Sequence, residues 1–184
     1  LDMGISYYRL VYARLTGEPF VVAETKNLLI REMTTKDLPE LYAVYSTLED
    51  CRYIEQLYDY DKELEFTKNY IKNMYGFFEY GLWLVFEKKS GELIGRAGIE
   101  NREIDGVTCR EIGYLIRRDM QHKGYAYEAC QAILEYASDE LGIQEMFAVI
   151  DKTNEPSRKL AQKLGFELYA QTDGGPDLYK FVFG

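Results

Sequence analysis

The feature that most restricts the fold of this chain is a strand, a long helix and a second strand that follow one another closely. Residues 108–116 and 145–151 are both rich in the apolar residues that favour strands. Between them, residues 124–141 carry apolar side chains at helical spacing, which predicts one buried helix face. Two strands that are joined through a helix lie parallel in one sheet, so we expect one parallel crossover unit.

Weaker patterns predict the other helices and strands. In chain order these are a strand at 28–33, helices at 35–45 and 62–77, strands at 82–86 and 93–100, a helix at 155–164, and strands at 166–170 and 178–183. Thr35 is the expected N-cap of the first helix, Asp105-Gly106 marks a turn, and Gly165 ends the last helix. The order β-α-α-β-β-β-α-β-α-β-β describes an α/β fold with one mixed sheet.

The first part of the chain carries a weaker signal. Residues 1–24 are expected to be an extension, with a short helix at 7–15 as the one element that we predict there. The organised domain is expected to cover residues 25–184, which is long enough to bury a core without disulfides or metal. The extension is a candidate for contacts in a homodimer. Because the chain begins at Leu1, a further domain upstream is also an open possibility.

Charge and apolar content exclude some partners. The chain has 31 acidic and 22 basic side chains and a net charge of −9. Proteins that bind nucleic acid usually present a basic face, so nucleic acid is not an expected partner. An acidic surface favours a cationic acceptor such as an amine, although solubility alone would explain the same balance. No apolar run approaches the length of a membrane span, so we expect no membrane partner.

The cysteines and the one histidine argue against several kinds of site. Cys51, Cys109 and Cys130 lie far apart and form no C-x-x-C pair, which is typical of a reducing compartment. We therefore expect a cytoplasmic protein without disulfides. His122 is the single histidine, and most metal sites need more ligands of this kind, so no metal is expected.

The strongest indication of a chemical function lies at residues 117–126, where the strand meets the long helix. The first N–H groups of a helix have no partner within it and lie at the positive end of its dipole, so this junction suits a phosphate. Gly124 permits close approach of the backbone, and Lys123, Arg117 and Arg118 add positive charge. A glycine that merely begins a helix is the simpler alternative for the same residues.

The pattern at this junction is Q-x-x-G-x-A, formed by Gln121, Gly124 and Ala126. The glycine motifs of P-loop and dinucleotide-binding proteins are absent. In its strand-loop-helix setting the pattern resembles the acyl-CoA pyrophosphate loop of the GNAT superfamily of N-acetyltransferases. Residues 111–116 and 123–129 are similar to the RimJ/RimL branch, which acetylates ribosomal-protein N-termini.

A second stretch supports the same resemblance. Asn154-x-x-Ser157, followed by residues 163–166, is similar to the second CoA-binding element of that branch. The resemblance extends over about residues 27–183 and implies the acyl-CoA N-acyltransferase fold, acetyl-CoA as cosubstrate and an amine as acceptor. The acceptor would be a small molecule or the α-amino group of a peptide or protein.

The resemblance also implies roles for individual residues. The backbone of Leu115, Ile116 and Arg117 would pair with the pantetheine arm of the cosubstrate. The pyrophosphate would be held by Gln121, His122, Lys123, Gly124, Tyr125 and Ala126. Asn154 would face the pantetheine, and Ser157 would lie near the thioester sulfur.

Attack of an amine on a thioester needs a general base, because most primary amines are protonated at neutral pH. Glu111 begins the strand before the loop and resembles the catalytic glutamate of several GNAT enzymes, so we favour it over Glu100, which ends the preceding strand. Many relatives use as acid a tyrosine seven residues after the asparagine, but here that position is Ala161. Ser157 or water is the alternative acid, and Tyr114 and Tyr169 are further candidates.

Three functions therefore remain open. The first is a catalytic N-acetyltransferase in which residues 53–61 help to shape the acceptor pocket. The second is a non-catalytic GNAT-like domain that binds CoA as a sensor or scaffold, possibly within a larger protein, and the loss of tyrosine at Ala161 favours it slightly. The third is a nucleotide-binding module without acyl chemistry.

Overall fold

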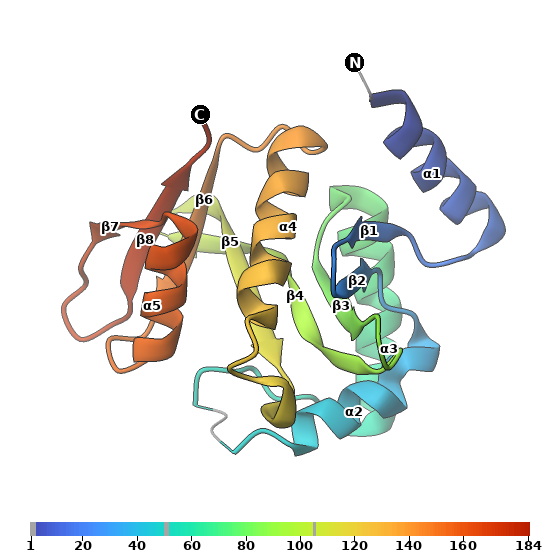
Figure 1. Ribbon diagram of the computed structural model, residues 1–184, viewed down its shortest axis with the longest axis horizontal. Coiled ribbons are helices and arrows are strands. Elements are labelled where there is room, and N and C mark those ends of the chain that lie inside the picture. The colour runs from blue at the N-terminus through green and yellow to red at the C-terminus, as the bar shows by residue number, and fades with distance from the viewer. Residues whose placement is uncertain (1–2, 50–51, 105) are drawn as a thin grey trace.

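The computed structural model describes residues 3–49, 52–104 and 106–184 (Figure 1). Within these residues eight strands form one sheet in the order β1-β2-β3-β4-β5-β6-β8-β7. The strands are β1 (Val21–Glu24), β2 (Leu28–Arg31), β3 (Leu82–Glu87), β4 (Leu93–Ile104), β5 (Val107–Ile116), β6 (Glu145–Ile150), β7 (Glu167–Ala170) and β8 (Asp177–Val182). Cys51 and Asp105, which the sequence analysis discussed, lie outside the described residues.

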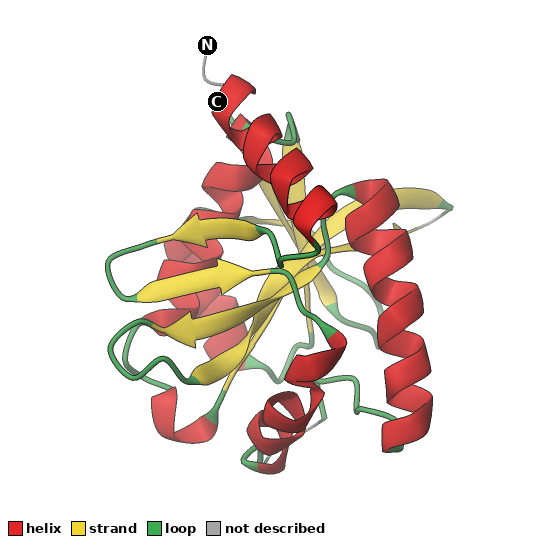
Figure 2. Cartoon of the chain, turned by 90° about the vertical axis from the view of Figure 1, so that its right-hand side faces the viewer, coloured by secondary structure: helices red, strands yellow, loops and turns green. Residues whose placement is uncertain are grey.

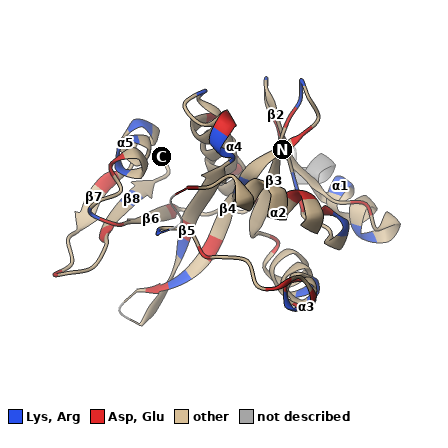
Figure 3. Ribbon diagram, turned by 90° about the horizontal axis from the view of Figure 1, so that it is seen from below, with Lys and Arg blue, Asp and Glu red and all other residues tan. Residues whose placement is uncertain are grey.

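Helices cover both faces of this sheet. The α-helices are α1 (Met3–Thr16), α2 (Leu38–Ser46), α3 (Tyr60–Tyr70), α4 (Tyr125–Asp139) and α5 (Glu155–Leu164). Short 3₁₀ turns form η1 (Thr35–Asp37) and η3 (Arg118–Met120), and a π-helix forms η2 (Ile71–Phe78). Figure 3 shows α4 and α5 on one side of the sheet and α3 on the other, and Figure 2 shows how strongly the sheet twists.

The parallel crossover unit is present as predicted. β5 pairs with β6 in parallel, whereas every other neighbouring pair in the sheet is antiparallel. The connecting helix α4 buries Cys130, Ile133 and Ala137, which lie three or four residues apart on the face toward the sheet, together with Ala129 beside them. The predicted mixed sheet and its α/β class are confirmed.

The beginning of the first predicted helix differs in detail. Thr34, and not Thr35, is the N-cap residue, because its backbone N–H donates to Asp37 Oδ2 at 2.7 Å and completes a capping box. The expected single helix is divided into η1 and α2, with Pro39 in the first turn of α2, where a missing N–H costs nothing.

The N-terminal extension contains more structure than we predicted. Its helix is the longer α1, and Val21–Glu24 forms β1, an edge strand that pairs antiparallel with β2 and that the sequence analysis did not expect. An ion pair and hydrogen bonds from Arg14 connect α1 to the rest of the chain. The Arg14 guanidinium donates to both carboxylate oxygens of buried Glu32, at 2.6 and 2.7 Å, and to the Tyr75 carbonyl at 2.9 Å.

One glycine lets the backbone pack unusually close to the centre of the sheet. A Cβ atom on Gly98 of β4 would lie 1.9 Å from the Gly81 carbonyl oxygen. The Ile99 N–H donates to that same oxygen at 3.1 Å, so the segment before β3 lies directly against β4. No larger side chain fits at Gly98 without moving backbone.

Candidate active site

The two edges of β5 are paired very differently. On one side β5 pairs with β4 along its whole length, from Val107 to Ile116. On the other side, within the described strands, the register with β6 consists of one pair, Glu111 opposite Phe147, after which the two strands part (Figure 1). We call residues 112–116 the open edge of β5.

Backbone groups at the open edge point away from β4. The Arg117 N–H donates to the Ile94 carbonyl of β4 at 2.6 Å, and hydrogen-bonding direction alternates along a strand. The N–H and C=O groups of Tyr114 and Ile116 are therefore turned toward the side where β6 has moved away. The Ile116 carbonyl accepts a hydrogen bond from Gln121 Nε2 at 2.9 Å. Of the three predicted pantetheine partners, Ile116 thus faces the open edge, while the backbone groups of Leu115 and the Arg117 N–H are turned toward β4.

Side-chain contacts connect β5 to the β6–α5 side. The Tyr114 hydroxyl lies 2.9 Å from Ser157 Oγ on α5. The Glu111 carboxylate interacts with the backbone N–H of Val149 on β6. Each contact joins a residue of β5 to one that lies far along the sequence.

The loop between α2 and α3 reaches the same region from the other face. The Tyr53 hydroxyl lies 2.6 Å from Thr153 Oγ1, in the turn between β6 and α5. Hydrogen bonds from the Thr153 side chain and backbone lower the pKa of Asp151, and the positive charge of Arg52 adds to this, so the loop lies near the end of β6. The Tyr53 contact holds this loop beside the β6–α5 turn, and the role of residues 53–61 at an acceptor site stays a prediction.

Two glutamates lie opposite each other beside the open edge. Glu100 of β4 and Glu111 of β5 are register partners, so their side chains share one face of the sheet. The Glu100 carboxylate extends over β5, with Oε2 3.4 Å from where a Cβ atom on Gly113 would be. Glu111 forms an ion pair with Arg102, whereas no hydrogen bond or ion pair joins Glu100 to another described residue.

Both carboxyl groups are harder to ionise than usual. Burial is the main cause of the raised pKa of Glu100, and the negative charge of Glu111 adds to it. Burial also raises the pKa of Glu111, although the hydrogen bond and the charge of Arg102 oppose this. A raised pKa brings a carboxylate closer to the range in which it can accept a proton from an amine.

The hydrogen-bonded hydroxyl groups of Tyr114 and Ser157 lie on the opposite face of β5 from the two glutamates. Burial raises the pKa of Tyr114 to about 12, so its phenol remains a proton donor at neutral pH. Its partner Ser157 is partly buried in the first turns of α5. Tyr169, the other candidate tyrosine, is 62% exposed and packs its ring against Phe147 instead.

The predicted site residue Asn154 lies at the start of α5. Asn154 is the N-cap of α5, and its side-chain oxygen accepts a hydrogen bond from the Ser157 N–H at 3.3 Å. Asn154 therefore holds the turn that carries Ser157. Ala161, which replaces the expected tyrosine, is buried one turn further along the helix.

The loop before α4 is exposed and has two residues in the left-handed region. His122 has φ 60° and Gly124, the residue that precedes α4, has φ 86°. Tyr125 and Ala126 begin α4, so their N–H groups have no partner within the helix. The exposed side chain of Lys123 has its Nζ 3.3 Å from Met120 Sδ. These features form the surface that an anion would meet at this helix N-terminus.

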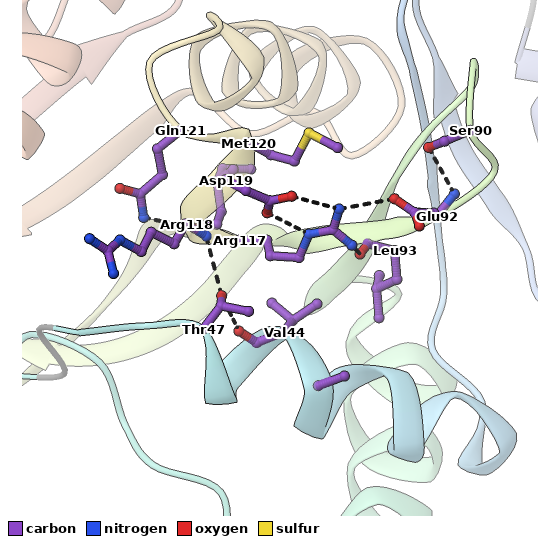
Figure 4. A network of polar contacts seen from close by, with 12 residues as sticks. Val44, Thr47, Ser90, Glu92, Leu93, Arg117, Arg118, Asp119, Met120 and Gln121 are labelled. Carbon is purple, nitrogen blue, oxygen red and sulfur yellow. Dashed lines mark hydrogen bonds and ion pairs between the residues drawn. The ribbon is translucent and has the colours of Figure 1, made fainter.

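The two arginines before this loop are already paired, and Figure 4 shows the partners of Arg117. Arg117 binds Asp119 at 2.7 Å and Glu92 at 2.9 Å, and Arg118 forms an ion pair with Glu49. The Arg118 N–H also donates to Thr47 Oγ1 at 3.2 Å, which joins the loop to the end of α2. The charge of Arg117 is therefore largely compensated within the protein.

Comparison with known proteins identifies the family to which this arrangement belongs. A profile of the acetyltransferase (GNAT) domain matches residues 27–167. This chain belongs to the GNAT family. YkkB of Bacillus subtilis strain 168 is 33% identical over 134 residues, which are 73% of this chain and 72% of YkkB. The uncharacterised N-acetyltransferase YnaD of the same organism is 33% identical over 143 residues, 77% of this chain and 79% of YnaD.

Solved GNAT structures show the same fold. The RimL ribosomal L7/L12 α-N-protein acetyltransferase superposes with a TM-score of 0.75 at 15% identity, over 90% of this chain and 95% of that one. RimL in complex with coenzyme A superposes with a TM-score of 0.70, also at 15% identity, over 88% and 97%. The predicted GNAT fold and acyltransferase class are confirmed.

Within the described residues no helix is both long and apolar enough to cross a membrane, and no three His, Cys, Asp or Glu side chains are grouped as metal ligands usually are.

The sequence analysis missed Arg96, a buried arginine of β4 on the same face as Glu100. Its only sequence signal is a single charge inside the apolar and glycine-rich run 93–99.

Proposed function

We propose that the chain transfers an acetyl group from acetyl-CoA directly to an amine at the open edge of β5. The parting of β5 from β6 carries this proposal, because it leaves strand backbone available to an extended ligand. The pantetheine arm would pair with the groups at Tyr114 and Ile116, and the pyrophosphate would meet the first amides of α4 and Lys123. Tyr114 is thereby added to the residues expected to pair with the pantetheine arm, and Arg117 is no longer expected to offer its N–H.

Glu100 is the general base in this mechanism. The Glu100 carboxylate lies over Gly113, beside the open edge, and carries no ion pair that would compete for its lone pairs. It accepts a proton from the acceptor ammonium, either directly or through water, and the freed amine attacks the thioester carbon. Glu111 stays paired with Arg102, and its negative charge raises the proton affinity of Glu100. This reverses the initial preference for Glu111.

Tyr114 and Ser157 supply the acid. As the new nitrogen–carbon bond forms, the carbon–sulfur bond breaks and the sulfur leaves with the electron pair. The Tyr114 hydroxyl, protonated at neutral pH and 2.9 Å from Ser157 Oγ, donates the proton that completes the free thiol. The acylated nitrogen loses its second proton through water, which returns a proton to the Tyr114 phenolate, and Glu100 releases its proton to solvent. Tyr114 thus takes the place of the tyrosine that is missing at Ala161.

Thiol release from acetyl-CoA with a panel of amines tests the proposal. We expect Glu100→Gln to lower kcat by about 100-fold or more, the usual range for a lost general base. Glu103→Gln, at the exposed tip of the same strand, is the matched control and should leave kcat unchanged. Glu111→Gln should keep more activity than Glu100→Gln and move the pH–rate profile toward lower pH, because it removes the charge that raises the pKa of Glu100.

Two results would contradict the proposal in different ways. An active Glu100→Gln together with an inactive Glu111→Gln would assign the base to Glu111. Thermal stabilisation by CoA without thiol release for any amine would instead favour the non-catalytic CoA-binding alternative. Equal protection by ATP and CoA would point to a nucleotide-binding module.

A further inference from the structure

Arg96 is a buried cation without an anionic partner. It lies on β4 opposite Leu115 of β5, and its residue is 6% exposed. The guanidinium Nε is buried and has no hydrogen-bond partner, and Nη1 makes one long contact, 3.5 Å from the Tyr45 hydroxyl. Within the described part of the chain no carboxylate forms an ion pair with Arg96.

The neighbouring tyrosines do not neutralise this charge. Tyr70 and Tyr75 interact electrostatically with Arg96, but their hydroxyls are engaged elsewhere. The Tyr70 hydroxyl accepts a hydrogen bond from the Leu82 N–H at 2.7 Å, and the Tyr75 hydroxyl donates to the Leu82 carbonyl. A buried guanidinium with unsatisfied N–H groups is costly unless an anion compensates it, so an additional partner is expected at this place.

Arg96 lies on the same face of the sheet as the proposed base. Along this face of β4, Gly98 lies between Arg96 and Glu100, so the Cα atoms of Arg96 and Glu100 are about 13 Å apart. Both side chains are long, so their charged groups can lie closer together than their Cα atoms. Burial and Glu111 raise the pKa of Glu100, and the positive charge of Arg96 partly opposes this rise. Glu55, in the loop after α2, adds negative charge near Glu100. This face therefore has an acidic end at Glu100 and a cationic end at Arg96.

We propose that Arg96 binds an anionic group of the acceptor, which is a small amine that also carries a carboxylate or phosphate. The inference rests on the proposed function: the ammonium of the acceptor lies at Glu100 while its anionic end forms a charge-assisted pair with Arg96. The partly exposed Tyr45 side chain on α2 makes the contact to Nη1, so this side chain must move before an acceptor can reach the guanidinium. A protein N-terminus without such an anionic group would leave Arg96 unpaired and is therefore disfavoured.

Matched acceptors test this inference in the wild-type enzyme. ω-Amino carboxylic acids of three, four and six carbons are compared with the alkylamines of the same length, with aminoalkyl phosphates, and with a short peptide that has a free N-terminus and an amidated C-terminus. We expect kcat/KM to be at least 30-fold higher for the best anionic acceptor than for its matched alkylamine. Carboxylates and phosphates in separate arms identify which anion is preferred.

Variants at Arg96 complete the test. Arg96→Met should remove the preference by raising KM for the anionic acceptor about 30-fold, while KM for the alkylamine and for acetyl-CoA stays unchanged. Arg96→Lys keeps the charge and should recover part of the preference, and Arg110→Met, at an exposed position on β5, is the control. If Arg96→Met does not fold, the wild-type panel and Arg96→Lys still decide.

The outcomes separate the two proposals. Turnover that is equal for anionic and uncharged amines, or highest for the amidated peptide, overturns the role of Arg96 and leaves the acetyltransferase intact. An absence of turnover with every amine overturns the proposed function itself.

Discussion

The two edges of β5 differ: one is fully paired with a neighbouring strand, and the other is where we propose that acetyl transfer takes place. Toward β4 the register is continuous over ten pairs, and toward β6 it is a single pair. The edge of β5 that faces β4, which we call the closed edge, is completed by backbone hydrogen bonds. At the open edge, side chains make the connection instead, through Tyr114–Ser157 and the Glu111 carboxylate with the Val149 N–H.

This difference predicts where mutations act. Backbone pairing on the closed edge leaves no room for a ligand, so changes there should affect folding. Groups at the open edge are few and partly buried, and burial is what raises the pKa values of Glu100 and Tyr114. Changes there should affect turnover more than folding.

The largest effect is expected from Gly98→Val on β4, the strand that pairs with β5 along its whole length and packs closely against the segment before β3 on its other side. A side chain at this position would clash with the Gly81 carbonyl, which is backbone and cannot rotate away. We expect a loss of more than about 4 kcal/mol, enough to prevent a stable fold. Circular dichroism and thermal unfolding measure this. Gly76→Ala, whose added Cβ would have its nearest atom at 3.7 Å, is the control and should stay folded. A well-folded Gly98→Val would disprove the tight packing at this position.

A smaller, purely kinetic effect is expected from Tyr114→Phe at the open edge. Removing the hydroxyl deletes the proposed proton donor, so kcat should fall by about 10- to 100-fold. The lost hydrogen bond to Ser157 should cost only about 1 kcal/mol of stability. Tyr169→Phe is the matched control, because its exposed ring lies against Phe147. Unchanged kcat in Tyr114→Phe would remove Tyr114 from the mechanism.

The smallest effect is a gain of stability in Glu100→Gln. Because the folded state raises the pKa of Glu100, its contribution to stability is complete below the ordinary value of 4.5 and is lost as the pH rises through the raised pKa. Glutamine cannot ionise and avoids that loss. We expect Tm to rise by about 2–4 °C at pH 8 and to be nearly unchanged at pH 4. A lower Tm at pH 8 would mean that the carboxylate is stabilising.

Much of the fold could be predicted because its signals are local. The apolar periodicity of α4 and the two β-rich segments around it are enough to indicate a parallel crossover. β1 was missed because a strand of four residues that follows Pro19 has too short a pattern to be recognised. Thr34 and Thr35 are both good N-cap residues, and only the position of Asp37 distinguishes them.

The site was less predictable because it depends on register and distance. Glu100 and Glu111 become neighbours only through the pairing of β4 with β5, and no local pattern contains that register. Tyr114 and Ser157 meet across 43 positions of sequence. The family resemblance supplied the loop at Gly124 and the turn at Asn154, but neither indicates which carboxylate is left unpaired.

The attachment of α1 has a practical consequence for work with shortened chains. The family match begins at residue 27, which invites removal of everything before it. Such a truncation would delete Arg14, and with it the cation that neutralises buried Glu32, as well as the outermost strand of the sheet. An isolated carboxylate would then remain in the interior, so a trimmed protein would be expected to aggregate or unfold even though every residue of the matched region is retained.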